Sequence, residues 1–310
     1  MMKKSSIVSL LVVVVSAAHG LCQEVHLERK LPEGGSYTTE ITGGIDQTLT
    51  IVGMETTTNV QTHTVSTSHI GSRANDGTLR VKEKVDSLQI NMGGTAGDYS
   101  FDSANPAESG SSPLEMFRPI HTMLAERATT VVYGEDNLVQ AIESDENVLA
   151  SLPVQVQALV KDQLDPATLK EAANQALAAL PDEPVRKGAS WERTESANFG
   201  AGQVMTFEVT YTYQGTVQHE GKTFDRINQK VGSVDFTLED NPALPLTLKD
   251  AKLKIAASQG FILFDRKVGQ IVKSSQKTRI AGGITFEANG MELPSKLDLT
   301  INSVTNVKVN

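Results

Sequence analysis

Residues Met205–Tyr213, with the sequence MTFEVTYTY, carry the clearest structural pattern in this chain of 310 residues. Apolar or aromatic side chains occupy every second position, and threonine or glutamate occupies the positions between them. Because successive side chains of a β-strand point to opposite faces, this alternation predicts a strand with one packed face and one wetted face. Strands of this kind are typical of antiparallel sheets.

More strands are expected on the C-terminal side of this segment. Gly260–Asp265 and Val268–Val272 flank a short polar turn and predict a hairpin. Leu297–Val309 alternates again and predicts a long final strand.

On the N-terminal side, residues 24–92 are rich in threonine and valine and show the same alternation. The pairs Gly34-Gly35 and Gly43-Gly44 predict turns within them. Between Thr78 and Met92 the apolar positions change phase by one residue, which would move the apolar side chains to the opposite face. We therefore predict a β-bulge near Asp86-Ser87 that absorbs the change.

The middle of the chain has a different pattern. Residues 93–113 are dense in Gly, Ser, Ala and Asn and predict a loop, and Arg127–Ile142 predicts a hairpin. Asp165 is a suitable N-cap for a helix that starts at Pro166. Apolar residues at helical spacing predict three helices, over Leu114–Leu124, Glu146–Gln163 and Pro166–Leu180.

Strands, a helical middle and strands again predict an α+β fold. The expected architecture is a large curved antiparallel sheet, similar to half of a barrel, with the helices packed on one face. Residues 23–310 are expected to form a single domain with a helical insertion at about residues 114–180.

The first 22 residues have the pattern of a secretory signal peptide. Lys3 and Lys4 give a basic start, Ile7–Ala18 is apolar but short for a membrane span, and small residues follow. Cleavage is expected after Gly20 or after Cys22, which is the only cysteine of the chain. The expected location is therefore periplasmic or extracellular. Leu21 precedes the cysteine where a lipoprotein signal has a small residue, which disfavours a lipid anchor.

The formal net charge of −9 limits the expected partners. No run rich in lysine or arginine occurs after residue 22, so the overall potential opposes nucleic acid and anionic lipid surfaces. No second apolar run approaches the length of a membrane span, so the mature chain is expected to carry no transmembrane segment.

The sequence offers little catalytic chemistry. It has no Gly-x-Ser-x-Gly motif, and Gly110-Ser111-Ser112 stands in the predicted loop. His63 and His69 would share one strand face, but no zinc-ligand spacing accompanies them. Gly93–Gly97 lacks the lysine and the helix of a phosphate-binding loop. We therefore expect no catalytic, cofactor or metal site, and no enzyme activity.

Binding without chemistry is the remaining hypothesis. Incomplete cover of the apolar sheet face would leave a cleft for an acyl chain or another lipophilic ligand, or for a partner segment. Complete cover would leave only a core, and the protein would be a structural or interaction module of the cell envelope. A hydrolase without a recognisable motif is the third alternative. The candidate residues that would line the ligand site are Phe207, Val209, Tyr211 and Tyr213.

Several short segments also resemble a known family when they are taken in order. They are Gly35–Tyr37, Tyr99–Ala104, Val132–Val139, Lys187–Trp191 and Phe264–Gly269. The chain resembles a family of secreted bacterial proteins of unknown function, about 300 residues long, that is common in planctomycetes. The family's layout is similar to the half-barrel of periplasmic lipoprotein carriers. The resemblance implies no catalytic residues, and a shared layout does not define a function.

Overall fold

The structure is a computed structural model that describes residues 24–105, 110–143, 152–239 and 246–310. The predicted signal peptide and the first part of the helix predicted from Glu146 lie outside the described residues.

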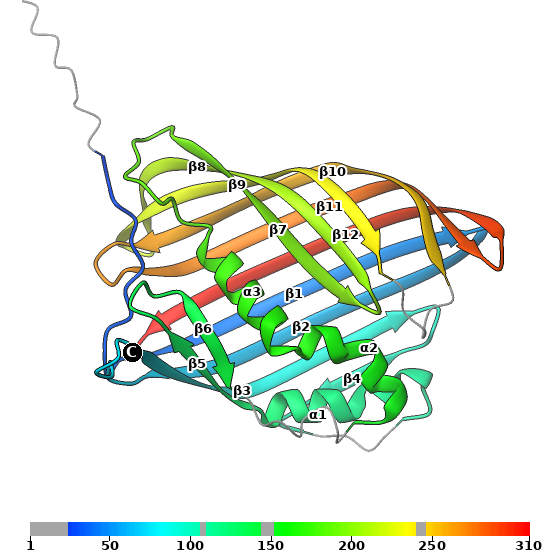
Figure 1. The fold of residues 1–310 in the computed structure, drawn as a ribbon, viewed down its shortest axis with the longest axis horizontal. Helices are drawn as coiled ribbons and strands as arrows, with labels where there is room; N and C mark the ends of the chain where they lie inside the picture. Colours follow the sequence, from blue (N-terminus) through cyan, green and yellow to red (C-terminus); the bar gives the residue numbers. More distant parts are fainter. Residues whose placement is uncertain (1–23, 106–109, 144–151, 240–245) are drawn as a thin grey trace, which may run out of the picture.

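The strands of the structure are long and the helices are short (Figure 1). The first group of strands is β1 (Ser36–Ile51), β2 (Met54–Ile70), β3 (Leu79–Gly94), β4 (Tyr99–Asp102), β5 (Ala128–Tyr133) and β6 (Val139–Glu143). The second group is β7 (Ser190–Gly200), β8 (Gln203–His219), β9 (Lys222–Leu238), β10 (Thr247–Asp265), β11 (Gln270–Ala288) and β12 (Met291–Val309). The helices between the groups are the 3-10 helix η1 (Pro113–Phe117), α1 (Arg118–Glu126), α2 (Val154–Leu164) and α3 (Pro166–Leu177).

All twelve strands belong to one antiparallel sheet, in the order β6-β5-β3-β2-β1-β12-β11-β10-β9-β8-β7, with β4 paired to β3. The first and last strands of the chain therefore meet in the middle of the sheet, where Tyr37 lies opposite Val309. The sheet is open, because β6 and β7 end the order at opposite edges. The predicted α+β class, with helices on one face of a large antiparallel sheet, is confirmed (Figure 1). We call the face toward α2 and α3 concave and the opposite face convex.

The strand around Met205–Tyr213 is β8, and its predicted alternation is confirmed. Met205, Val209, Tyr211 and Tyr213 are 4%, 1%, 1% and 3% exposed. Phe207 is half-buried and packs against the same apolar side chains. The segment thus has its apolar face on the concave side of the sheet.

The predicted bulge in β3 is also present. Opposite β2, the register passes from Ser87 to Val85, so Asp86 is the extra residue. The turn predicted at Gly43-Gly44 is wrong, because both glycines lie within β1. A Cβ atom on Gly43 would lie 2.8 Å from Thr62 Oγ1, so we attribute this glycine to close packing between strands. The loop predicted over residues 93–113 contains an additional strand, β4.

Each of the three described α-helices has a proline at its N-terminus, either as the N-cap or in the first turn. Asp165 caps α3 and accepts hydrogen bonds from the backbone N–H groups of Ala167 and Thr168, with Pro166 in the first turn, as predicted. Pro119 lies in the first turn of α1 and separates it from η1, so the predicted helix over Leu114–Leu124 is divided in two. Pro153 is the N-cap of α2.

Side-chain amides from α2 and α3 bind both free edges of the sheet. Asn174 accepts a hydrogen bond from Val139 N at 2.8 Å and donates one to Val139 O at 3.0 Å, as a neighbouring strand would. On the other edge, Ser196 N donates to Gln175 at 2.9 Å, and Gln163 donates to the carbonyl of Asn198 at 3.2 Å. The helices therefore bridge β6 and β7 and satisfy edge groups that would otherwise be available to another chain.

Candidate functional site

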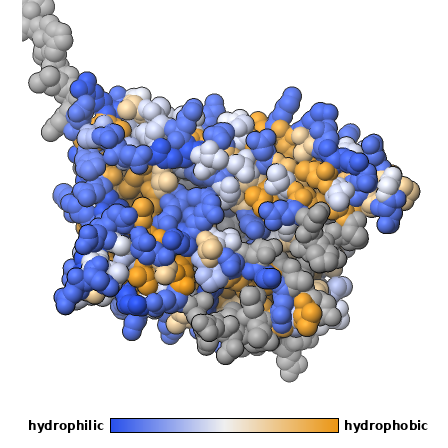
Figure 2. Space-filling model, viewed as in Figure 1, coloured by the Kyte–Doolittle hydropathy of each residue, from blue (hydrophilic) through white to orange (hydrophobic). Residues whose placement is uncertain are grey.

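The helices cover only part of the concave face. Ala179 and Leu180, just after α3, pack with Val209 and Tyr211 in one buried cluster. Over β1 the cover is incomplete, because Ile41, which shares the concave face with Ile45, is 39% exposed. Figure 2 shows this side of the molecule, with apolar residues reaching the surface in several separate places.

The segment Lys30–Gly35, which contains a turn at Glu33-Gly34, crosses one end of the sheet before β1, and we call it the strap (Figure 1). Lys30 N donates to Gly269 O at 2.9 Å, and Gln270 donates a side-chain hydrogen bond to the Lys30 carbonyl. At the other end of the strap, Gly34 N donates to Ile70 O at 3.1 Å. These bonds fix the strap to the β10–β11 turn and to the end of β2.

A pocket of about 330 Å³ lies between the strap and the ends of β1 and β12, and we call it the strap pocket. Its apolar lining consists of Leu31, Pro32, Tyr37, Ile70, Val268 and Val309. Its polar lining consists of Lys30, Ser36, Lys267 and Gln270. Leu31 and Ile70 also belong to the buried cluster on the concave side of β3 and β5, so the pocket opens at the edge of a formed core.

Two cations flank this apolar pocket. The side chains of Lys30 and Lys267 are exposed, and neither forms an ion pair with another described residue. An exposed ammonium group beside apolar walls provides a place for the charged end of an amphiphile.

Tyr37 is a half-buried lining residue of the pocket. Burial raises the pKa of its phenol above the ordinary value, and the nearby Tyr133 raises it further, whereas a hydrogen bond to Ser68 lowers it. The phenol is therefore neutral at physiological pH and acts as a hydrogen-bonding group.

The four residues predicted to line a ligand site lie elsewhere. Val209, Tyr211 and Tyr213 belong to the cluster closed by Leu180 and by Leu27, which precedes the strap. None of the four lines the strap pocket. Their role in ligand binding stays a prediction.

Tyr211 is held by polar as well as apolar contacts. Its ring stacks on Trp191 with centroids 5.8 Å apart, and its hydroxyl donates to Glu195. Burial raises the pKa of Glu195 above its ordinary value. The pKa of Tyr211 is also raised, first by burial and then by the Glu195 charge, so Tyr211 stays a neutral donor.

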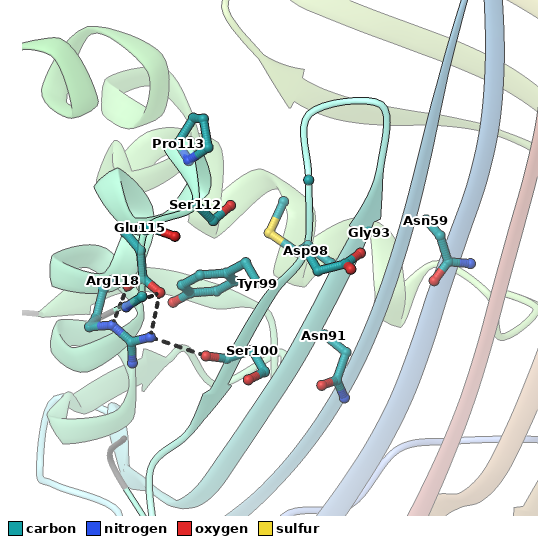
Figure 3. A pocket seen from close by; sticks show the side chains of 14 residues that line it. Asn59, Asn91, Gly93, Asp98, Tyr99, Ser100, Ser112, Pro113, Glu115 and Arg118 are labelled. Atoms are coloured by element: carbon teal, nitrogen blue, oxygen red, sulfur yellow. Dashed lines mark hydrogen bonds and ion pairs between the residues drawn. The ribbon is translucent and has the colours of Figure 1, made fainter. Parts of the chain in front are cut away.

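A larger and more polar pocket, of about 760 Å³, lies beside β4 and η1 (Figure 3). Arg118 lies on one side of it and forms hydrogen bonds of 2.6 and 3.0 Å with Glu115 and of 3.2 Å with the Ser100 carbonyl. Asn59 and Asn91 lie on the other side (Figure 3). Arg118 Nε and Nη2 are paired with Glu115 and Ser100, and only its buried Nη1 has no hydrogen-bond partner among the described residues. Tyr99, the aromatic residue of the lining, is 4% exposed and offers no ring for stacking, so this pocket is the weaker candidate.

His121 packs against Tyr99, which lines the polar pocket. The Tyr99 hydroxyl and His121 Nδ1 are 2.7 Å apart, so a neutral imidazole whose proton is on Nε2 accepts a hydrogen bond from the phenol there. The pKa of His121 is lowered from 6.5 to about 4, first by burial and second by the Arg118 charge.

This histidine makes stability depend on acidity. Between about pH 4 and 6.5 the unfolded chain binds more protons than the folded one, so the free energy of unfolding decreases as the pH falls through this window. Replacing His121 with Gln, which can still accept a hydrogen bond, should remove roughly 2 kcal/mol of this dependence between pH 7 and 4.5. Urea unfolding at both pH values would measure it, with His26→Gln on the exposed N-terminal segment as the control. An unchanged pH dependence would show that folding does not lower the pKa of His121.

The other described histidines form no cluster that could bind a metal ion. His63 is 2.8 Å from Glu40 at an exposed position. In the part of the chain that the structure describes, no three metal-ligating side chains are grouped.

A family model matches residues 76–220, somewhat less than half of the chain. Its description is "Family of unknown function (DUF6263)". The match supports the resemblance to a family of unknown function, whereas the planctomycete range stays a prediction. The strap, β1 and β10–β12 lie outside the match. A search of curated proteins found no match.

Several solved structures are similar in part. A lipovitellin structure concerned with lipid–protein interactions has a TM-score of 0.42 and 10% identity over 91% of this chain, which spans 25% of that chain. A putative exported protein with a YmcC-like fold from Bacteroides fragilis has a TM-score of 0.21 and 9% identity, over 89% of this chain and 98% of that chain. An outer-membrane channel from Pseudomonas putida F1 has a TM-score of 0.26 and 10% identity, over 91% of this chain and 98% of that chain. Scores this low assign no function to this chain.

Among the described residues, no helix is long and apolar enough to cross a membrane.

Proposed function

We propose that this protein is an exported, non-enzymatic binding protein that holds a lipophilic anion in the strap pocket. The observation that carries the proposal is an apolar pocket of about 330 Å³ flanked by Lys30 and Lys267. Its volume is at the lower end of the range of roughly 300–1,000 Å³ for ligand cavities. Export rests on the signal-peptide pattern of the first 22 residues.

The apolar and the charged residues of the lining would bind different parts of the ligand. Six apolar residues take the chain of the ligand, and each methylene removed from water contributes about 0.8 kcal/mol. The two ammonium groups attract an acidic head at the rim. The lining includes Ser36 but no histidine or carboxylate that could activate it as a nucleophile, and this supports binding without catalysis.

Dodecanoate and dodecanol have the same apolar chain, but only dodecanoate has an acidic head, so together they separate the role of the apolar lining from the role of the two lysines. We expect the protein to bind both in isothermal titration calorimetry. The double variant Lys30→Ala and Lys267→Ala should weaken dodecanoate binding about fivefold and leave dodecanol binding unchanged, because only the acid gains from the ammonium groups. Lys82→Ala with Lys84→Ala, on the convex face of β3, is the control of equal charge.

A second variant tests the location. Val309→Trp should fill the pocket and weaken both ligands, whereas Asn310→Trp, outside the lining, should not. Absence of binding to either ligand would contradict the proposed function. Binding that none of the pocket variants alters would place the ligand elsewhere.

One observation favours the alternative of an interaction module. Val52, Met54 and Met291 are 57%, 71% and 63% exposed at the tips of two hairpins. The tips are adjacent, since Val52 N donates to the Pro294 carbonyl at 3.1 Å. Exposed apolar tips favour contact with a partner protein, and their replacement with serine should weaken that contact without changing ligand binding.

A further inference from the structure

The lysines of β9–β12 are dispersed in the sequence but gather on one side of the sheet. On β11, Gln276, Thr278 and Ile280 face the concave side, where Ile280 is fully buried. The alternate residues Lys273 and Lys277 therefore face the convex side.

The pairing register extends this convex area across four strands. Lys273 lies between Leu263 on β10 and Asn306 on β12, and Arg226 on β9 lies opposite Leu263. Neighbouring strands are about 4.8 Å apart and alternate residues about 6.7 Å apart, so these side chains share one surface. We call it the basic face. It consists of Arg226, Asn228, Lys230, Gln259, Phe261, Lys273, Ser275, Lys277, Asn302, Val304, Asn306 and Lys308, whereas Leu263 beneath them is 2% exposed.

The basic face holds five cationic residues. At its border with β1 lies one carboxylate, Glu40, which is opposite Asn306 and 2.8 Å from His63. Arg226 lies 4.6 Å above the ring of Phe261 and donates to Asn228 at 2.9 Å. Lys230, Lys273, Lys277 and Lys308 form no ion pair with any other described residue.

The opposite end of the same strands is different. There Lys249 pairs with Glu287, Lys252 with Asp250 and Arg279 with Asp298, at 2.6, 2.7 and 2.6 Å. Lys254 and Lys296 lie in that region and form no ion pair with another described residue, so the contrast between the two ends is one of degree. The basic face is the end of the sheet that also carries the strap pocket, where Val309 of the lining follows Lys308.

We propose that the basic face binds the surface of an anionic lipid bilayer. Charges more than about 8–10 Å away are screened at physiological ionic strength. A surface in contact with this face therefore meets five cationic residues and the bordering Glu40, which is a local excess of positive charge, rather than the net charge of −9. Phe261 and Val304 lie between the cations and suit the boundary between lipid head groups and acyl chains. A broad convex sheet offers no groove for a nucleic acid strand, which favours a bilayer.

Vesicle flotation tests this inference with the full mature chain and no added ligand, so its result is independent of the proposed pocket function. We expect binding to vesicles of phosphatidylcholine with 30% phosphatidylglycerol, loss of binding at high salt, and no binding to phosphatidylcholine alone. The triple variant Lys273→Gln, Lys277→Gln and Lys308→Gln should bind about a hundredfold more weakly.

Lys161→Gln on α2 with Lys187→Gln and Lys222→Gln removes the same charge from exposed positions outside the basic face, and it should retain binding. Circular dichroism would verify that both variants are folded. Equal weakening of both variants would overturn the inference, because net charge alone would then explain binding. Failure to bind anionic vesicles would also overturn it, and binding to heparin or duplex DNA instead would identify a different polyanion.

Discussion

Replacing Tyr211 with Asp should lower the free energy of unfolding by at least about 4 kcal/mol. Tyr211 is 1% exposed, its ring stacks on Trp191, and its hydroxyl donates to Glu195. The substitution removes an aromatic side chain from a closed cluster and places a carboxylate beside Glu195, whose own pKa is already raised by burial. Urea or thermal unfolding would measure the loss.

Thr212→Asp is the matched control. Thr212 follows in β8, faces the convex side and shares a hydroxyl contact of 2.9 Å with Ser190. The same added charge should cost less than about 1 kcal/mol there, because water can reach it. Equal losses at the two positions would show that the strand faces are assigned incorrectly.

Replacing Asp225 with Ala should lower the free energy of unfolding by about 3 kcal/mol. This carboxylate is 2% exposed and accepts hydrogen bonds from the Tyr213 hydroxyl at 2.6 Å and from Arg266 at 2.5 and 2.7 Å. Its removal takes the acceptor from both donors. The Arg266 side chain is 39% exposed and can be rehydrated, so we expect a loss at the lower end of the range for a broken buried ion pair.

The exposed pair of Asp182 and Arg193 provides the comparison. The two side chains approach to 2.7 Å, but that of Asp182 is 82% exposed. Asp182→Ala should therefore cost at most about 1 kcal/mol. If Asp225→Ala were equally mild, the network around Asp225 would have no net effect on stability, whereas a smaller loss for Asp225→Asn than for Asp225→Ala would locate the effect in its hydrogen bonds.

Local patterns predicted much of the fold. The alternation in β8 and the change of phase at Asp86 are properties of neighbouring residues, and both are present in the structure. The cap at Asp165 is equally local, since its side chain binds the next helical turn. Gly43-Gly44 misled the prediction, because glycine at a turn and glycine at a close approach of strands look alike in sequence.

The candidate sites could not be predicted in this way. The strap pocket joins Leu31, Ile70, Val268 and Val309, which are brought together only when β1 pairs with β12 and the strap binds the β10–β11 turn. The net charge led to the expectation that anionic lipid surfaces are opposed, although the register collects lysines into the basic face. No run of basic residues marks these lysines in the sequence.

The amino-acid sequence by itself determined which segments become strands and helices and which face of β8 is packed, because periodicity, capping and bulges depend on residues a few positions apart. Only the tertiary structure decided where the pocket and the basic face lie. Both depend on strand register between distant segments, such as Tyr37 opposite Val309, and that register is set by the packing of the whole sheet.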